Sequence, residues 1–72
     1  MNASTQLEHN EMLQIRLAVL QREHRDLDLV IQEEEAGVNP DQLLLRRHKR
    51  QKLTLKEQIV KIEDDLIPDI IA

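Results

Sequence analysis

The chain has 72 residues, fourteen acidic and ten basic, with a formal net charge of −4 and neither cysteine nor any aromatic residue. Disulfides and thiolate zinc sites are therefore excluded, and any core must be aliphatic. A composition that is 40% hydrophobic and 33% charged, with a single glycine, is typical of a helical, coiled-coil-like protein forming one domain, residues 1–72.

The first ten residues are polar, and the longest apolar runs are three or four residues, as in Leu17–Leu20 and Leu43–Leu45. A membrane-spanning helix needs about 20 consecutive apolar residues, and a secretory signal needs an apolar segment near its start. The sequence therefore predicts no membrane partner and a cytoplasmic location.

The first predicted helix covers about residues 5–36. Its apolar stripe follows alternating spacings of four and three, which is the coiled-coil period. The stripe consists of Leu13, Leu17, Leu20, His24, Leu27 and Ile31. Gly37 follows at the position where a helix end favours a residue with positive φ, so a turn is predicted at 37–40.

The second predicted helix covers about residues 40–67. Asn39 is expected as its N-cap, Pro40 as its first-turn proline and Asp41 as a favourable charge at its positive end. Its stripe has the same period and consists of Leu45, His48, Lys52, Leu55, Ile59, Ile62 and Leu66. An apolar tail, 68–72, follows Pro68.

A short turn between two striped helices predicts an all-α fold, an antiparallel two-helix hairpin of coiled-coil type. The expected register places Leu27 near His48, Leu20 near Leu55 and Leu13 near Ile62. Charge supports the pairing, since residues 1–36 carry a net charge of −5 and residues 39–67 a net charge of +2. Asp26 and Asp28 are expected alongside the basic run that includes Arg47, Lys49 and Arg50.

Both helices carry further apolar residues off the seam, and one hairpin cannot bury two faces of each helix. These residues are Met12, Ile15 and Val19 in the first helix and Leu53, Val60 and Ile67 in the second. The tail adds Ile70 and Ile71, which either fold back or dock on a partner. Together they predict a partner interface. The partner is either a second copy, which would give a dimeric helical bundle, or another helical protein.

Two blocks of sequence resemble a known family. Residues 23–31, with Glu23-His24 followed by Leu27-Asp28 and Ile31, and the block Lys52–Ile59 are similar to the two signatures of the YdcH-like small bacterial proteins. The resemblance covers about residues 20–72, including the closing Pro-Asp-Ile-Ile-Ala. It implies a short helical hairpin of unknown function, and it supplies no activity. His48 departs from the family pattern, which has leucine there.

The histidines and acids have two interpretations each. His24 and His48 could form a metal site or a pH switch, but polar residues in a seam more often set register, and His9 lies near the N-terminus. Glu33-Glu34-Glu35 occupy consecutive positions and diverge around the helix axis, which does not suit a metal site. No metal and no cofactor is predicted.

The basic run of the second helix predicts an alternative function. Arg46, Arg47, Lys49 and Arg50 could bind the phosphates of RNA or DNA, although the net charge is acidic and no aromatic residue can stack on bases. No arrangement of nucleophile, base and phosphate loop is present, so we expect the protein not to be an enzyme. The leading interpretation is a helical-hairpin interaction protein that self-associates.

Overall fold

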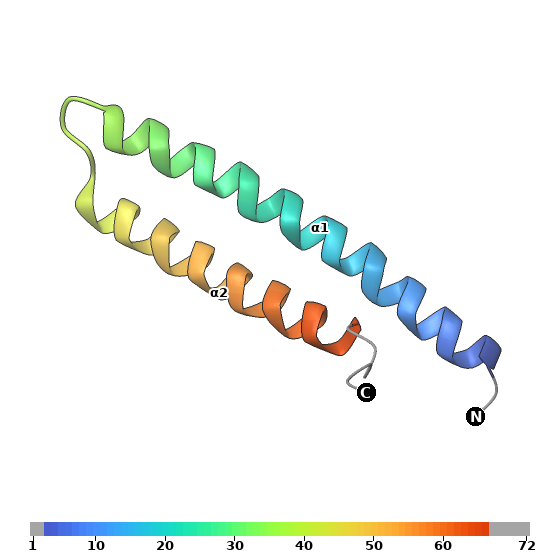
Figure 1. Cartoon of the computed structure of the whole chain (residues 1–72). Coiled ribbons are helices and arrows are strands. Elements are labelled where there is room, and N and C mark those ends of the chain that lie inside the picture. Colours follow the sequence, from blue (N-terminus) through green and yellow to red (C-terminus); the bar gives the residue numbers. More distant parts are fainter. Residues whose placement is uncertain (1–2, 67–72) are drawn as a thin grey trace.

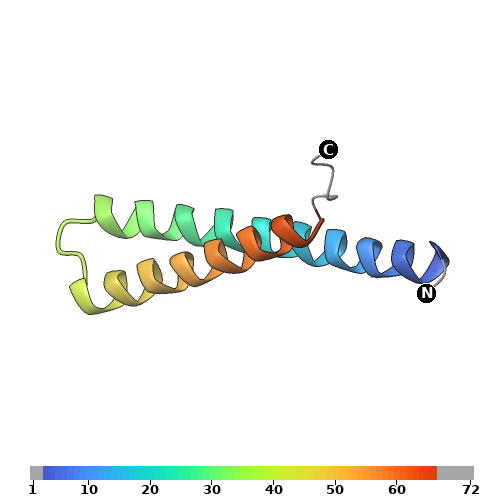
Figure 2. The same cartoon turned by 60° about the horizontal axis from the view of Figure 1, so that its bottom comes forward.

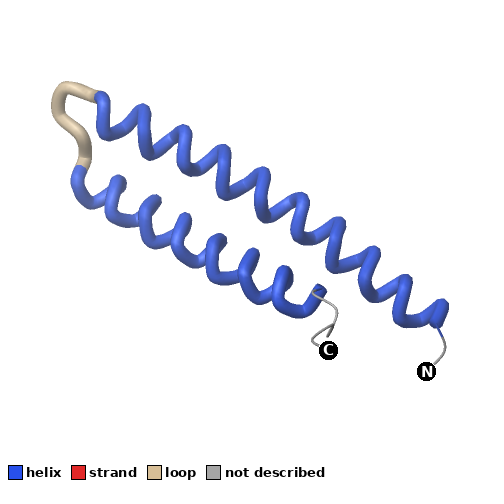
Figure 3. The backbone as a smooth tube through the Cα atoms, in the orientation of Figure 1, coloured by secondary structure: helices blue, strands red, loops and turns tan. Residues whose placement is uncertain are grey.

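The structure, a computed structural model, describes residues 3–66, with side chains from Leu7 onward. Two α-helices, α1 (Ala3–Ala36) and α2 (Gln42–Leu66), are joined by one loop (Figure 3). The helices lie side by side and run in opposite directions (Figures 1 and 2). The predicted all-α helical hairpin is confirmed.

The helix ends differ slightly from the predicted ranges. α1 begins at Ala3 rather than at residue 5 and ends, as expected, at Ala36, whereas α2 begins at Gln42 rather than at residue 40. The last described residue, Leu66, ends α2. The predicted continuation to Ile67 and the apolar tail 68–72 lie outside the described residues.

Asp41, and not Asn39, caps the start of α2. Its Oδ1 accepts hydrogen bonds from the amides of Leu43 and Leu44 at 3.1 and 3.2 Å, and its carbonyl accepts the first helical bond, from the amide of Leu45, at 2.9 Å. These are the contacts of an N-cap residue, and a carboxylate makes them strongly at the positive end of a helix. Pro40 therefore precedes the cap instead of opening the first turn.

The end of α1 also differs from the prediction. Gly37 does not have a positive φ. Instead, its amide donates a hydrogen bond of 3.2 Å to the carbonyl of Glu34, three residues earlier. Such a tightened last turn satisfies a terminal carbonyl without the left-handed conformation that favours glycine.

The predicted stripes form the seam between the helices. Every position of both stripes is buried or half-buried. The buried members are Leu20, Ile31, Leu45, Ile59 and Ile62. Leu20, Ile59 and Ile62 form the central cluster, against which Leu13, Leu17, Leu55 and Leu66 pack.

The register of the seam is about one heptad away from the predicted one. His48 Nδ1 lies 2.8 Å from Glu34 Oε1, and Glu34 is seven residues closer to the turn than Leu27, the predicted neighbour. Lys52 Nζ lies 2.5 Å from Asp28 Oδ1, although Asp28 was expected beside Lys49. A shift of one heptad again places aliphatic residues opposite aliphatic residues, so the hydrophobic pattern cannot distinguish the two registers.

This register leaves the N-terminal part of α1 without a helical neighbour. α1 continues beyond the last residue of α2 in both views (Figures 1 and 2). Leu13 is the first residue of α1 that packs on the central cluster. The two positions that would extend the seam upstream, Asn10 and Gln6, carry polar amides. The seam therefore ends where its apolar pattern ends.

Replacing Asp41 by alanine should lower stability by about 1 kcal/mol, because two amides lose their acceptor. For a chain of this size, that corresponds to a fall in melting temperature of about 4–8 °C, measured by circular dichroism at one protein concentration. Asp41→Asn should retain most of the stability, since the amide oxygen still accepts. Asn39→Ala should have no effect, and a comparable loss in that variant would contradict the assignment of the cap.

Candidate interaction surface

The hairpin exposes more large apolar side chains than it buries. Within residues 7–66, five apolar side chains are buried, whereas eleven large ones are between 39 and 96% exposed. The molecule is elongated, with extents of 56 × 23 × 15 Å and a radius of gyration of 16.8 Å, against about 11 Å for a compact domain of this length. These exposed side chains are the candidates for a contact surface.

The first predicted stripe is solvent-exposed along α1. The side chains of Met12, Ile15 and Val19 are 69, 65 and 51% exposed. Their spacing of three and four residues places them on one face of the helix. Leu7, one turn and a half before Met12, is 60% exposed.

The second predicted stripe, on α2, is also exposed. Leu53 is 58% and Val60 is 42% exposed, and the two are one heptad apart. The remaining predicted interface residues, Ile67, Ile70 and Ile71, lie outside the described residues.

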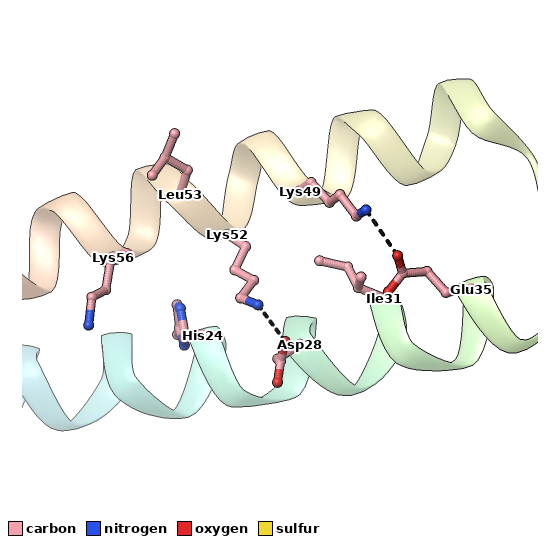
Figure 4. A pocket seen from close by; sticks show the side chains of 8 residues that line it. All are labelled: His24, Asp28, Ile31, Glu35, Lys49, Lys52, Leu53 and Lys56. Atoms are coloured by element: carbon pink, nitrogen blue, oxygen red, sulfur yellow. Dashed lines mark hydrogen bonds and ion pairs between the residues drawn. The ribbon is translucent and has the colours of Figure 1, made fainter.

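The two stripes lie on opposite sides of the seam. Leu53 lines a groove together with His24 and Asp28 of α1 (Figure 4). A separate groove on the other side of the seam is lined by Glu23 and Leu27 of α1 with Gln51, Thr54 and Leu55 of α2. Val19 is one helical turn before Glu23, so the stripe on α1 borders this second groove. The predicted interface therefore consists of two separate surfaces.

Ion pairs bridge the groove that contains Leu53. Lys52 contacts Asp28, and Lys49 Nζ lies 2.9 Å from Glu35 Oε2 (Figure 4). The hydrogen bond from Lys52 holds the pKa of Asp28 below its ordinary value of 3.8, and this contact outweighs the opposing loss of hydration. These pairs connect the two helices across this groove and give Asp28 and Glu35 each a lysine partner.

Some side chains in the basic run of α2 contact a carboxylate of α1, and others do not. His48, Lys49 and Lys52 face α1, and each contacts one of its carboxylates. The arginines make no ion pair or side-chain hydrogen bond within the described part of the chain. They line one shallow groove, which consists of Arg46, Arg47 and Arg50 with Leu43 and Gln51. The residues proposed for nucleic-acid binding are thus three arginines without an ion pair among the described residues and one lysine that forms an ion pair with Glu35.

Three exposed apolar residues near the turn, Val38, Leu43 and Leu44, were missed by the sequence interpretation. Val38 in the loop is 96% exposed, and Leu43 in the first turn of α2 is 78% exposed. Val38 was read only as part of the turn, and Leu43 and Leu44 only as part of an apolar run. The one sign in the sequence that they are exposed is that they lie outside the heptad stripe.

The histidines do not come together. His48 contacts Glu34, whereas His24 lines the groove of Figure 4 without a hydrogen-bond partner among the described residues. In that part of the chain, no three histidine, aspartate or glutamate side chains are grouped closely enough to hold a metal ion. Within the described residues, neither helix has an apolar stretch long enough to cross a bilayer.

Comparison with known proteins places the chain in a family. A family profile described as "Protein of unknown function (DUF465)" matches residues 17–63, which is more than half of the chain. The chain belongs to this family. The matched residues include the central cluster, the loop and all three ion pairs between the helices. No curated protein and no solved structure matches the chain.

The ion pair between Asp28 and Lys52 should make stability depend on pH. Because the pKa of Asp28 is lowered in the folded state, its contribution is present above the ordinary value of 3.8 and is lost as the pH falls through the folded-state value. Asp28→Asn should therefore melt below the parent at pH 7, and the gap should close as the pH falls below about 4.

Asp26→Asn is the matched control at a protein concentration at which the parent is monomeric, because Asp26 is exposed and has no partner within the hairpin among the described residues. We expect its melting temperature to follow the parent at every pH. A gap between Asp28→Asn and the parent that stayed constant down to pH 2 would contradict the role of the Asp28 carboxylate.

Proposed function

We propose that this member of the family is a helical-hairpin interaction protein that self-associates and acts by contact, not by catalysis. The excess of exposed over buried large apolar side chains carries the proposal. A hairpin with so small a core gains stability when a partner removes these side chains from water. The stripe on α1 and the stripe on α2 are the surfaces that a partner would cover.

A second copy of the chain is the favoured partner, and another helical protein is the alternative. The heptad spacing of Met12, Ile15 and Val19 suits packing against a helix, because side chains at this spacing fit between those of a facing helix. Ile67, Ile70 and Ile71 would extend the interface of α2 within the same proposal.

We also infer that the family of unknown function is the YdcH-like group of small bacterial proteins. Both blocks that carry the resemblance, residues 23–31 and 52–59, lie within the matched range 17–63. A cytoplasmic location remains a prediction from the sequence.

RNA or DNA binding is the second candidate function. The observation in its favour is the groove in which Arg46, Arg47 and Arg50 lie together without carboxylate partners among the described residues. Guanidinium groups in this arrangement can contact neighbouring phosphates. The remaining cation of the predicted face, Lys49, already contacts Glu35.

Changing Ile15 and Val60 together to lysine should shift the protein toward the monomer, because a charge at each stripe opposes burial. We expect a dimer of the parent at micromolar concentrations in sedimentation experiments, and a smaller species for the double variant. Gln14→Lys with Gln58→Lys adds the same charge at exposed polar positions and should leave the dimer unchanged. A fully helical parent that stayed monomeric at every concentration would refute self-association.

Salt separates the two candidate functions. Phosphate binding should weaken steeply as the salt concentration rises, by about an order of magnitude or more between 50 and 200 mM when several phosphates are contacted. Apolar association should change little over this range. Fluorescence anisotropy with a mixed-sequence RNA and with its DNA equivalent would measure the first, and Arg46→Gln with Arg50→Gln should abolish it. Salt-sensitive RNA binding that these changes do not affect would exclude the arginine groove.

A further inference from the structure

The apolar stripe on α1 is bordered by charges that have no partner within the hairpin. Glu11 and Arg25 lie on one edge of the stripe, two heptads apart, with Ala18 midway between them. His9 and Glu23 lie on the other edge, also two heptads apart, with Arg16 midway. None of these charged side chains contacts another described residue in an ion pair, and all are exposed.

We propose that two copies of the chain pair through this face of α1 in antiparallel orientation, with Ile15 of each copy opposite Val19 of the other. The inference rests on the proposed self-association and names its surface. When two identical helices run in opposite directions, the edge that carries Glu11, Ala18 and Arg25 lies beside the same edge of the other copy. A two-fold axis then passes beside Ala18, which faces itself.

This arrangement matches opposite charges along one edge. Glu11 of each copy faces Arg25 of the other, so the contact contains this pair twice. The small side chain of Ala18 at the axis lets the two helices approach closely there. Along the other edge, His9 of each copy faces Glu23 of the other.

The arrangement has one like-charge contact at its centre and one at each end. Arg16 meets its own copy across the axis, and Glu8 comes near Asp26. These side chains are exposed in the single hairpin. In the pair, Arg16 lies at an edge of the contact and Glu8 and Asp26 lie at its ends, so solvent and salt still weaken their repulsion. A parallel pair is worse, because it places Glu8, Arg22 and Asp26 each opposite the identical residue, which makes three like-charge contacts on the stripe itself. The antiparallel pair makes two such contacts on the stripe and places Arg22 opposite Met12.

The free end of α1 makes the arrangement sterically open. α1 extends beyond α2 (Figures 1 and 2), and Met12, Ile15 and Val19 of the stripe are exposed. The stripe lies on the side of the seam opposite to Leu53. A second α1 can therefore lie along the stripe without displacing α2, and Val60→Lys alone should leave the dimer intact.

Charge reversal tests the orientation. Glu11→Lys should raise the dissociation constant about tenfold, because two attractive contacts become repulsive. Adding Arg25→Glu should restore it to within about threefold of the parent, since the pairs are re-formed with exchanged signs. Arg16→Gln should tighten the antiparallel dimer, whereas in a parallel dimer it would weaken association, because Arg16 would then face Glu11. Sedimentation equilibrium gives the constants, and circular dichroism checks that each variant is helical.

A single cysteine tests the position of the axis, since the chain has none of its own. Ala18→Cys should oxidise to a disulfide-linked dimer far faster than Gln14→Cys, which is exposed on α1 away from the stripe. Rapid cross-linking with restored affinity in the double charge variant would establish the antiparallel pair. A dimeric parent in which neither result appears would overturn this pairing and leave self-association intact. A parent that is monomeric throughout would overturn both.

Discussion

Asp28 and Glu34 meet Lys52 and His48 across the seam, and these contacts determine which heptad of α2 lies beside which heptad of α1. Aliphatic residues recur every heptad on both helices, so hydrophobic packing alone leaves several registers close in free energy. A cation at the seam is costly unless a carboxylate meets it. This register gives Lys52 and His48 each a carboxylate partner, and the length of α1 that remains without a neighbour follows from it.

The sequence predicted the features that depend on local pattern. Both helices, their seam positions and the short connection follow from a 3.5-residue apolar period interrupted by glycine and proline. The start of α2 was less predictable, because Asn39 and Asp41 are both good caps, and only the folded backbone shows that Asp41 reaches the amides of Leu43 and Leu44. The seam register was not predictable for the same kind of reason, since two arrangements one heptad apart have similar apolar patterns.

The sequence identified the residues of the candidate surfaces, but it did not show how these residues are arranged on the hairpin. Met12 and Leu53 were each recognisable as apolar positions off the seam, and both are exposed. Their placement on opposite sides of the hairpin depends on how far each stripe is rotated from the seam and on the reversal of α2 relative to α1. Val38 and Leu43 had no periodic signal at all, because loop and first-turn residues do not repeat.

The division of the basic run explains why charge alone is a poor guide to the function of this protein. His48, Lys49 and Lys52 of α2 each contact a carboxylate of α1, so part of the basic run that resembles a phosphate-binding face serves the hairpin itself. The surfaces that remain available to a partner are a groove of three arginines on α2 and an apolar stripe on α1. Different kinds of partner would cover these two surfaces. Because burial of apolar surface is nearly independent of salt and phosphate binding is not, the stripe and the groove can be distinguished by their response to salt.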